Sequence, residues 1–420
     1  MSWKRNTALF ITSQTLSLLG TMIVQYAIMW HLVLETRSGV MMTLYIIVGV
    51  LPTFLSSIFG GVLADRYDKK LLINLSDGGI GLVSLLFALF LLSGHQSMAL
   101  LLVAAGLRAL GQGVQQPTVG SLIPLIVPED RLLKINGINS SIQPMIFIVS
   151  PIVAAGLMAA VPLWVLFLVD VATALGAICI LQFLVHVPRI ERRDLVQSIK
   201  PSYFADLREG LRYIRSQRWL VLLIVMSICF SFGTTPAASL TPLQVTRDFG
   251  PELWRLTAIE VVWAAGMVVG GLLVGLWSPR NRILSIGVSS LVTAVGLALL
   301  GVWTQFGLYL ACMGVCGIVQ IYSQAPSMTI LQERVAPEFL GRVMSVFTMI
   351  GSLAMPVGMM VFGPLADVIT IDSMMIGSGT LIGVLSIWVL SNRTLRAAGL
   401  PPATAPSSCE DRAEGCCGSP

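Results

Sequence analysis

Charged side chains are scarce in this 420-residue chain. Asp, Glu, Lys and Arg make up only 11% of it, whereas 55% of its residues are hydrophobic and the mean hydropathy is +0.84. Soluble globular proteins are about one quarter charged, so a soluble fold is excluded. Because one bilayer crossing takes roughly 20 apolar residues as a helix, the chain holds about a dozen spans and no sizeable soluble domain.

The residue patterns that build metal or nucleotide sites are also missing. There are three histidines, and no G-x-x-x-x-G-K-[ST] loop that would bind nucleotide phosphates. Four of the seven cysteines fall in apolar runs and three in the C-terminal tail. This distribution matches neither a disulfide framework nor a zinc site. We therefore predict no metal, no cofactor, no nucleotide and no nucleic-acid partner.

Apolar runs separated by short polar segments predict twelve transmembrane helices. The first six runs cover residues 8–34, 40–64, 71–94, 97–125, 135–160 and 162–186, and the second six cover 219–245, 254–278, 283–303, 306–331, 343–366 and 373–392. The first run has no cleavage site after a short apolar core, so we interpret it as a span and not a signal peptide. We predict an N-terminal six-helix bundle over 1–187, a cytoplasmic linker over 188–218, a C-terminal six-helix bundle over 219–392 and a disordered cytoplasmic tail over 393–420.

The basic residues orient these spans. If the N-terminus is cytoplasmic, 22 of the 26 Lys and Arg residues fall in cytoplasmic segments and three, Arg37, Arg247 and Arg255, in outer ones. The remaining base, Arg108, lies within a span. Such an asymmetry is the positive-inside pattern and requires this span count and parity. Both termini are therefore predicted to be cytoplasmic.

The two halves of the chain are related in sequence. A shift of 210 residues aligns residues 60–63 with 270–273, and a shift of 209 superposes Gln115, Pro117, Thr118, Pro128 and Glu129 on Gln324, Pro326, Ser327, Pro337 and Glu338. Parallel six-helix repeats with a substrate site between them near the midplane are a common build of secondary transporters. An all-α integral membrane fold of two pseudo-symmetric bundles is expected.

The loop after the second span carries a specific pattern. Residues 61–70 read Gly-Val-Leu-Ala-Asp-Arg-Tyr-Asp-Lys-Lys and resemble the signature G-x-L-A-D-R-x-[GD]-[RK]-[RK] of the major facilitator superfamily, with all eight fixed positions matched. The resemblance implies the major facilitator fold and a cytoplasmic gate that latches the outward-facing state. The gate residues it implies are Gly61, Asp65, Arg66, Lys69 and Lys70.

Other segments resemble family motifs less closely. Residues 108–113 are similar to the membrane-embedded arginine motif, with the glycines displaced by one position, and residues 150–156 are a degenerate form of the glycine–proline segment of drug antiporters. Small residues and prolines within spans let helices approach and bend. The expected positions of helix bending and packing are Ser150, Pro151, Gly156, Pro117 and Pro326.

Most of the chain further resembles the macrolide-efflux branch of the superfamily. The similar segments include Leu122 to Gly137, Ile259-Glu260, residues 270–273 and Tyr322 to Pro326. The resemblance implies a multi-pass protein of a bacterial cytoplasmic (inner) membrane that exports small hydrophobic antibiotics in exchange for protons. Macrolides are the first choice, tetracyclines or siderophores are the alternative, and a monomer in the lipid bilayer is expected.

Four ionisable residues cannot be placed in any loop: Asp77, Arg108, Asp170 and Glu260. A charge at the centre of a span costs about 2.5–3.5 kcal/mol on insertion scales and is by default a functional hypothesis. A proton antiporter needs an acid whose proton affinity differs between its two states, and burial and a nearby cation are two causes of such a difference. We predict that Glu260 and Asp170 couple protons, that Arg108 tunes one of them, and that Asp77 is a further candidate.

Polar side chains within the spans are candidates for a substrate cavity. They are Gln25, Tyr26, Gln112, Gln115, Gln143, Gln320, Tyr322 and Gln324. Two other functions are less favoured. A metabolite uptake symporter could share the fold. An integral-membrane enzyme would require a catalytic cluster in a loop, but the outer loops are only a few residues long, so we predict that the chain is not an enzyme.

Overall fold

The computed structural model describes residues 3–94, 97–187, 203–276, 281–392 and 394–395, and within them the regular structure is helical. Twelve helical segments have the length and composition to cross a membrane, which confirms the predicted number. The helices of the N-terminal half are α1 (Trp3–Thr36), α2 (Gly39–Arg66), α3 (Lys69–Leu92), α4 (Met98–Ile126), α5 (Leu132–Ala160) and α6 (Leu163–Cys179). A 3₁₀ turn (Glu129–Arg131) precedes α5, and a π turn (Ile180–Leu184) extends α6.

The C-terminal half contains a short helix, α9, between two of its membrane-spanning helices. Its helices are α8 (Arg218–Ser239), α9 (Thr241–Asp248), α10 (Leu253–Leu276), α11 (Arg282–Leu300), α12 (Phe306–Arg334), α13 (Pro337–Leu365) and α14 (Ile371–Ser391), and α7 (Tyr203–Ser216) precedes them. The predicted seventh run, 219–245, is thus divided between α8 and α9. Pro242 lies at the start of α9, where its missing amide hydrogen costs nothing.

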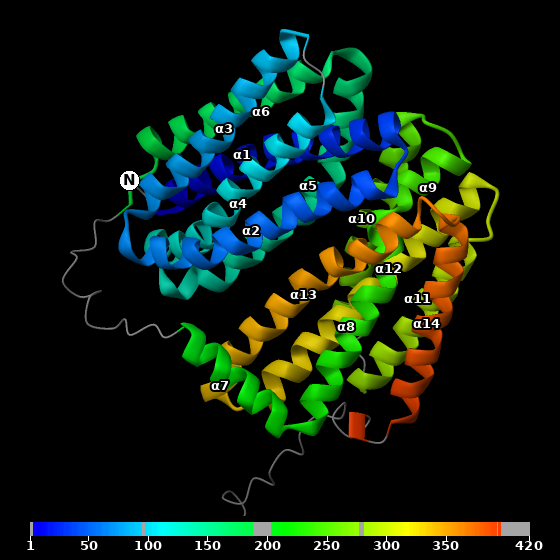
Figure 1. Cartoon of the computed structure of the whole chain (residues 1–420). Coiled ribbons are helices and arrows are strands. Elements are labelled where there is room, and N and C mark those ends of the chain that lie inside the picture. Colours follow the sequence, from blue (N-terminus) through cyan, green and yellow to red (C-terminus); the bar gives the residue numbers. More distant parts are fainter. Residues whose placement is uncertain (1–2, 95–96, 188–202, 277–280, 393, 396–420) are drawn as a thin grey trace, which may run out of the picture.

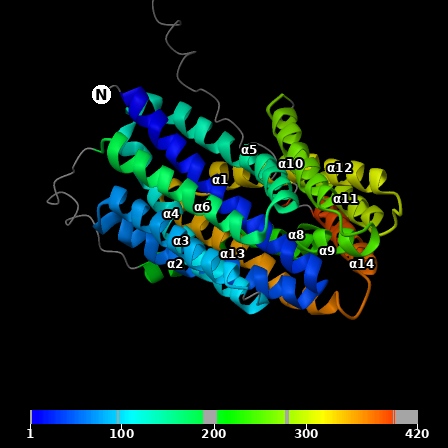
Figure 2. The same ribbon diagram turned by 90° about the horizontal axis from the view of Figure 1, so that it is seen from above.

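The two halves repeat the same packing. In the N-terminal half α2 packs on α4, α3 on α4 and α6, and α1 on α5 and α6; in the C-terminal half α10 packs on α12, α11 on α12 and α14, and α8 on α13 and α14. The halves lie side by side in Figure 1. They meet where α13 packs on α2 and α10 packs on α5, which Figure 2 shows from above. This is the pseudo-symmetric fold that the sequence repeat predicts.

The N-terminal caps of two corresponding helices, α3 and α11, are also alike in the two halves. Asp68 caps α3 by accepting a hydrogen bond from the Leu71 amide, and Asn281 caps α11 by accepting one from Leu284. Side-chain caps of this kind satisfy amides that have no partner within the helix. The two caps align α3 with α11 at a sequence shift of 213 residues. The sequence repeats align α2 with α10, and α4 with α12, at shifts near 210.

Close packing between α2 and α4 depends on Gly60 and not on its neighbour Gly61 of the predicted gate loop. A Cβ on Gly60 would lie 2.9 Å from the Gly113 carbonyl oxygen, whereas a Cβ on Gly61 would meet no atom within 4 Å. In the second half a Cβ on Gly270 would lie 2.4 Å from the Ile318 carbonyl oxygen, and Gly271 again faces open space. Neighbouring residues on a helix point about 100° apart, so only one glycine of each pair faces the partner helix.

Gly156 is a correction to the predicted packing positions. It is exposed and a Cβ there would meet no atom within 4 Å, so it does not mediate a close helix contact. The other predicted packing positions lie within α4, α5 and α12: Ser150, Pro151 and Pro326 are buried, and Pro117 lies beside Gly60. The Pro117 ring is 3.2 Å from a Cβ built on Gly60.

The predicted domain boundaries lie partly outside the described residues. This applies to residues 188–202 of the predicted linker and to all but Thr394 and Leu395 of the predicted tail. The described part of the linker forms α7, which packs against α13 and α8. Residues exposed on the outer faces of the spans are apolar, such as Phe59, Leu75 and Val384, as a lipid-facing surface requires.

Candidate functional site

Two of the four charges within the spans form a buried ion pair. Arg108 on α4 donates from Nη1 to the Asp170 carboxylate on α6, and the two residues are 2% and 1% exposed. Ser84 on α3 donates a 2.6 Å hydrogen bond to the same oxygen, Oδ2 of Asp170. Arg108 also donates from Nη2 to the backbone oxygen of Thr21 on α1, at 3.3 Å. Four helices of the N-terminal half therefore converge on one neutralised pair of charges.

Asp77 forms a second buried cluster next to the first. Its Oδ1 accepts hydrogen bonds from Ser17 Oγ at 2.5 Å and from Gln115 Nε2 at 2.6 Å. Its Oδ2 is buried and has no hydrogen-bond partner among the described residues. Ser17 lies one turn before Thr21 on α1, and Thr21 Oγ1 contacts Asp170 Oδ1 at 3.5 Å. One face of α1 thus connects both buried acids.

Glu260 lies apart from these clusters, at the interface between the halves. Its side chain extends from α10, and its Oε2 accepts a hydrogen bond from the Tyr26 hydroxyl of α1 at 3.4 Å. Tyr26 in turn packs against Trp30, with ring centroids 5.4 Å apart. Arg108 therefore pairs with Asp170 and not with Glu260. Of the three acids within the spans, Glu260 is the one for which the described residues show a hydrogen-bond partner in the opposite bundle.

The halves are tied together at the predicted outer end by Asp367, in the loop between α13 and α14. Its carboxylate accepts hydrogen bonds from the backbone amides of Gly39 at 2.7 Å and Val40 at 3.0 Å and from Ser38 Oγ at 2.8 Å. These groups form the N-terminus of α2, where the helix dipole favours a negative charge. Partial burial raises the pKa of Asp367, but the hydrogen bonds outweigh it and hold the pKa below its ordinary value.

Arg247 of α9 completes this contact. Its Nη2 donates to Asp367 Oδ1 at 2.9 Å and to the backbone oxygen of Arg37 at 2.5 Å, and its Nη1 donates to the backbone oxygen of Ala366 at 2.6 Å. We call Ser38, Gly39, Val40, Arg247 and Asp367 the outer latch. It joins the loop between α1 and α2 to the C-terminal half, so the two halves are tied together at this end of the molecule.

The predicted cytoplasmic gate loop makes no such contact. Asp65 and Arg66 are exposed, and no hydrogen bond or ion pair of their side chains is recorded within the described part of the chain. Lys69 Nζ donates to the Ala64 backbone oxygen at 2.7 Å, and Lys70 Nζ donates to the backbone oxygens of Gln182 and Val185, each at 2.8 Å. All of these contacts stay within the N-terminal half, so the loop does not join the two halves in this conformation.

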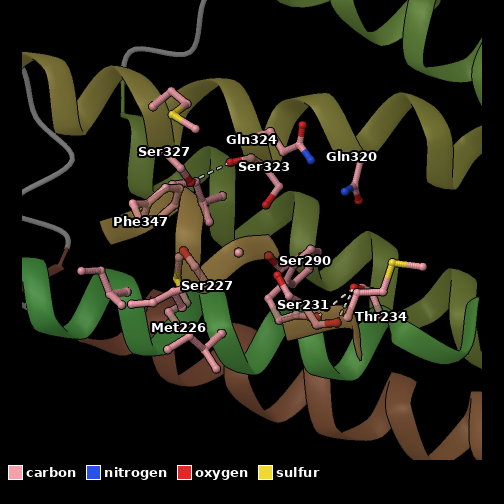
Figure 3. Close-up of a pocket in the computed structure, with 18 of the residues that line it drawn as sticks. Met226, Ser227, Ser231, Thr234, Ser290, Gln320, Ser323, Gln324, Ser327 and Phe347 are labelled. Carbon is pink, nitrogen blue, oxygen red and sulfur yellow. Dashed lines mark hydrogen bonds between the residues drawn. The ribbon is translucent and has the colours of Figure 1, made fainter. Parts of the chain in front are cut away.

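The C-terminal half contains a cavity of about 610 Å³, which we call the C-half pocket. It lies between α8, α11, α12 and α13, and Figure 3 shows Gln320 and Gln324 of α12 on one side with Ser231 and Thr234 of α8 on the other. Ser290 of α11 also faces this space. A volume of this size falls in the usual range of small-molecule sites, roughly 300–1,000 Å³.

Only Gln320 and Gln324 of the eight predicted cavity residues line this pocket. Tyr26 and Gln115 are instead engaged by Glu260 and Asp77. The other four lie elsewhere in the spans: Gln25 and Gln143 are exposed, and Gln112 and Tyr322 are half-buried. The side of a helix that faces a cavity depends on how the helices pack, which residue type alone does not determine.

Sequence reasoning missed several residues of these sites. The hydroxyl residues Ser227, Ser231 and Thr234 recur at intervals of four and three along α8, a spacing that places them on one helix face and would have identified the stripe. Asp367, in a predicted outer loop, was also missed. The signal that could have found it is a short repeat, because residues 365–367 have the same sequence, Leu-Ala-Asp, as residues 63–65 of the gate loop.

Comparisons with known proteins agree on one family. The profile of the Major Facilitator Superfamily matches residues 8–359. Macrolide efflux protein A of Streptococcus pyogenes is 30% identical over 392 residues, covering 92% of this chain and 95% of the relative. An enterobactin exporter of Escherichia coli is 25% identical over 408 residues, covering 91% and 90%. A bacterial homologue of the human lysosomal transporter Spinster has the same fold, with a TM-score of 0.73 at 14% identity and coverage of 96% and 99%.

Proposed function

We propose that this chain, which belongs to the Major Facilitator Superfamily, exports hydrophobic or amphipathic antibiotics by proton antiport, with macrolides as the first candidates. It is a transporter and not an enzyme, because its family and its structural neighbours are transporters. Twelve spans and bacterial efflux relatives place it in a bacterial inner membrane as a multi-pass protein. We expect it to function as a monomer.

The hydrogen bond between Glu260 and Tyr26 carries the proposal of proton antiport. It crosses the interface between the halves. If the outer end opens, the halves separate there and Glu260 loses Tyr26 and meets water. Because the proton affinity of a carboxyl group depends on burial and on hydrogen bonding, the two states differ in proton affinity at this position. Such a difference is what proton exchange with the outer side requires.

Asp170 and Asp77 have supporting roles in this proposal. Both contact one face of α1, through Ser17 and Thr21, and the same helix carries Tyr26 on a different face. A movement of α1 that breaks the Tyr26 contact therefore also shifts the partners of the two buried acids. Asp170 keeps Arg108 as its counter-ion, so we place proton exchange first at Glu260 and second at Asp170.

We assign alternating access to two latches that close in turn. The outer latch is formed here, while Asp65 and Arg66 are exposed. In the opposite state we expect Asp65, Arg66, Lys69 and Lys70 to engage the C-terminal half on the cytoplasmic side. Charge-assisted hydrogen bonds of this type are roughly twice as strong as neutral ones.

A siderophore is the alternative substrate, and the 25% identity to an enterobactin exporter supports it. A tetracycline remains a further candidate within the same fold, and an uptake symporter is the alternative in direction. A susceptibility panel of macrolides, tetracyclines and phenicols in an efflux-deficient bacterial host separates the drugs. Energy-dependent accumulation of substrate in expressing cells, instead of its loss, would show uptake.

The proposal is tested by drug accumulation in such cells. We expect the wild type to lower accumulation of a labelled macrolide and a protonophore to restore it. Glu260→Gln and Asp170→Asn should abolish the difference, whereas Glu252→Gln, the same change at a half-exposed acid just before α10, should retain it. Full export by both Glu260→Gln and Asp170→Asn would contradict the assignment.

A further inference from the structure

The C-half pocket differs in charge from the corresponding region of the N-terminal half. Among the described residues that line it, none is ionisable. The shift of 213 residues defined by the caps of α3 and α11 places Ser290 where the N-terminal half has Asp77, and the shift of 209 places Gln324 at Gln115. Gln115 is bonded to Asp77, but Gln324 has no acid beside it and lines the pocket.

Three hydroxyl groups that line the pocket donate their hydrogens to the helix backbone. Ser227 donates to the Leu223 backbone oxygen at 2.9 Å, Thr234 to Phe230 at 3.0 Å and Ser327 to Ser323 at 2.8 Å. A hydroxyl group has one hydrogen to donate and two lone pairs. With its hydrogen committed to the helix backbone, each of these oxygens retains accepting capacity for a ligand.

The glutamine amides supply the opposite function. Gln320 and Gln324 each carry two N–H donors and one carbonyl acceptor. No side-chain hydrogen bond of either is recorded within the described residues, and Figure 3 shows both on the pocket side of α12. The remaining lining is apolar and includes Phe230, Phe347 and Met355. The pocket therefore offers donors, acceptors and apolar surface but no charge.

We infer that the C-half pocket binds the uncharged, oxygen-rich part of an amphipathic ligand, with hydroxyl and carbonyl groups on an apolar skeleton, and disfavours cationic groups. This rests on the proposed export function. An ammonium group entering the pocket would lose its hydration and find no carboxylate among the described lining residues, which is costly. A drug that carries an amine must therefore leave the amine outside this pocket.

The inference is tested by equilibrium binding to the purified full-length protein in lipid nanodiscs at pH 8. The probes are a neutral hydroxylated macrolactone without an amine, and tetraphenylphosphonium as a lipophilic cation. We expect the wild type to prefer the macrolactone. Gln324→Glu should weaken macrolactone binding roughly tenfold and strengthen binding of the cation, because it places a carboxylate in the pocket.

Two further variants keep the test decisive. Gln324→Leu should weaken macrolactone binding without improving cation binding, since it removes hydrogen bonds and adds no charge. Gln305→Glu makes the same chemical change as Gln324→Glu at an exposed position before α12, outside the pocket, and should alter neither affinity. Unchanged binding of both probes in the two folded Gln324 variants, or wild-type preference for the cation, would overturn the inference.

These measurements are independent of proton coupling. Binding that follows the expected pattern in a protein that shows no proton-driven export would leave the inference standing and remove the proposed function. Proton-driven export with affinities that Gln324 does not influence would do the reverse.

Discussion

At the scale of single residues, the ion pair of Arg108 and Asp170 places two charges out of contact with water, which costs free energy that their mutual attraction offsets. Both side chains are almost completely buried, and the arginine is held by groups from α1, α3 and α6. Removing one partner of a buried ion pair leaves the other charge without compensation, which typically costs about 3–5 kcal/mol. Replacing both partners removes both charges and costs less.

This comparison gives the first prediction. Arg108→Leu and Asp170→Leu should each destabilise the protein by about 3–5 kcal/mol, and the double variant by less than the sum. The measurement is unfolding of the purified protein in detergent micelles, as a double-mutant cycle. Additive losses would show that the two side chains do not act as a pair.

The second prediction concerns pH at the predicted outer end. Partial burial and the neighbouring Asp372 carboxylate raise the pKa of Asp248 to about 6, and Arg247 opposes this rise. A raised pKa means that the folded state favours the protonated acid. Its contribution to stability is therefore complete below the ordinary range of Asp and is lost as the pH rises through about 6.

Melting temperatures measured between pH 4 and pH 7.5 check it. The difference between Asp248→Asn and the wild type should grow in favour of the variant as the pH rises through about 6. Asp130→Asn is the matched control, because Asp130 is 68% exposed at the opposite end, and it should follow the wild type. A constant difference for Asp248→Asn across this range would contradict the assignment.

Residue types were predictable where the membrane makes them conspicuous. Asp77, Arg108, Asp170 and Glu260 stand out because no loop accounts for them. Their partners were not predictable. Ser17 and Ser84 are ordinary residues of apolar helices, and Tyr26 was predicted only as a cavity residue, because packing alone brings each of them within hydrogen-bond distance of an acid. The pairing of Arg108 with Asp170, and not with Glu260, also follows from which helices are neighbours.

At the scale of helices, small residues decide how closely α10 approaches α12. Gly270→Ala would place a Cβ 2.4 Å from the Ile318 backbone oxygen, and a backbone atom cannot move aside without shifting the helix. We predict a loss of about 1–3 kcal/mol, typical of overpacking. The adjacent Gly271→Ala is the control, because a Cβ there meets no atom within 4 Å.

Thermal unfolding of the two variants in the same detergent distinguishes them. Gly270→Ala should melt well below the wild type and Gly271→Ala close to it. If Gly271→Ala proved the more damaging of the two, the packing of α10 described above would be wrong.

The outer latch gives the fourth prediction. Asp367 accepts hydrogen bonds from the Gly39 and Val40 amides, so those amides report directly on the latch. Asp367→Asn and Arg247→Ala should each speed deuterium exchange at the start of α2 and leave exchange in the middle of α3 unchanged. Since the pKa of Asp367 lies below its ordinary value, the wild-type latch should persist at neutral pH and weaken only in acid below that range.

Exchange at residues 38–43 that is identical in all three proteins would show that the latch does not hold the end of α2.

The number of helices and the repeat were predictable from hydropathy and spacing, because the lipid imposes span length. The division of the seventh run into α8 and α9, which brings Arg247 to Asp367, was not, since it depends on a contact between distant loops.

At the scale of the whole molecule, a symmetric fold carries an asymmetric charge distribution. The N-terminal half buries Asp77, Arg108 and Asp170, whereas the C-half pocket is lined by hydroxyl, amide and apolar groups among its described residues. Glu260 lies between the halves and bonds to Tyr26. We propose that this separates the two tasks of an antiporter, with protons handled by the N-terminal half and the interface, and the drug by the C-terminal half.

Proteoliposomes with an imposed pH gradient test this account most directly. With an acidic lumen, purified wild type should accumulate a labelled macrolide, and a proton ionophore that collapses the gradient should stop it. Glu260→Gln should abolish the gradient-driven uptake but retain exchange of labelled for unlabelled macrolide in the absence of a gradient. Equal gradient-driven uptake by Glu260→Gln and the wild type, or wild-type uptake that ignores the gradient, would contradict the account.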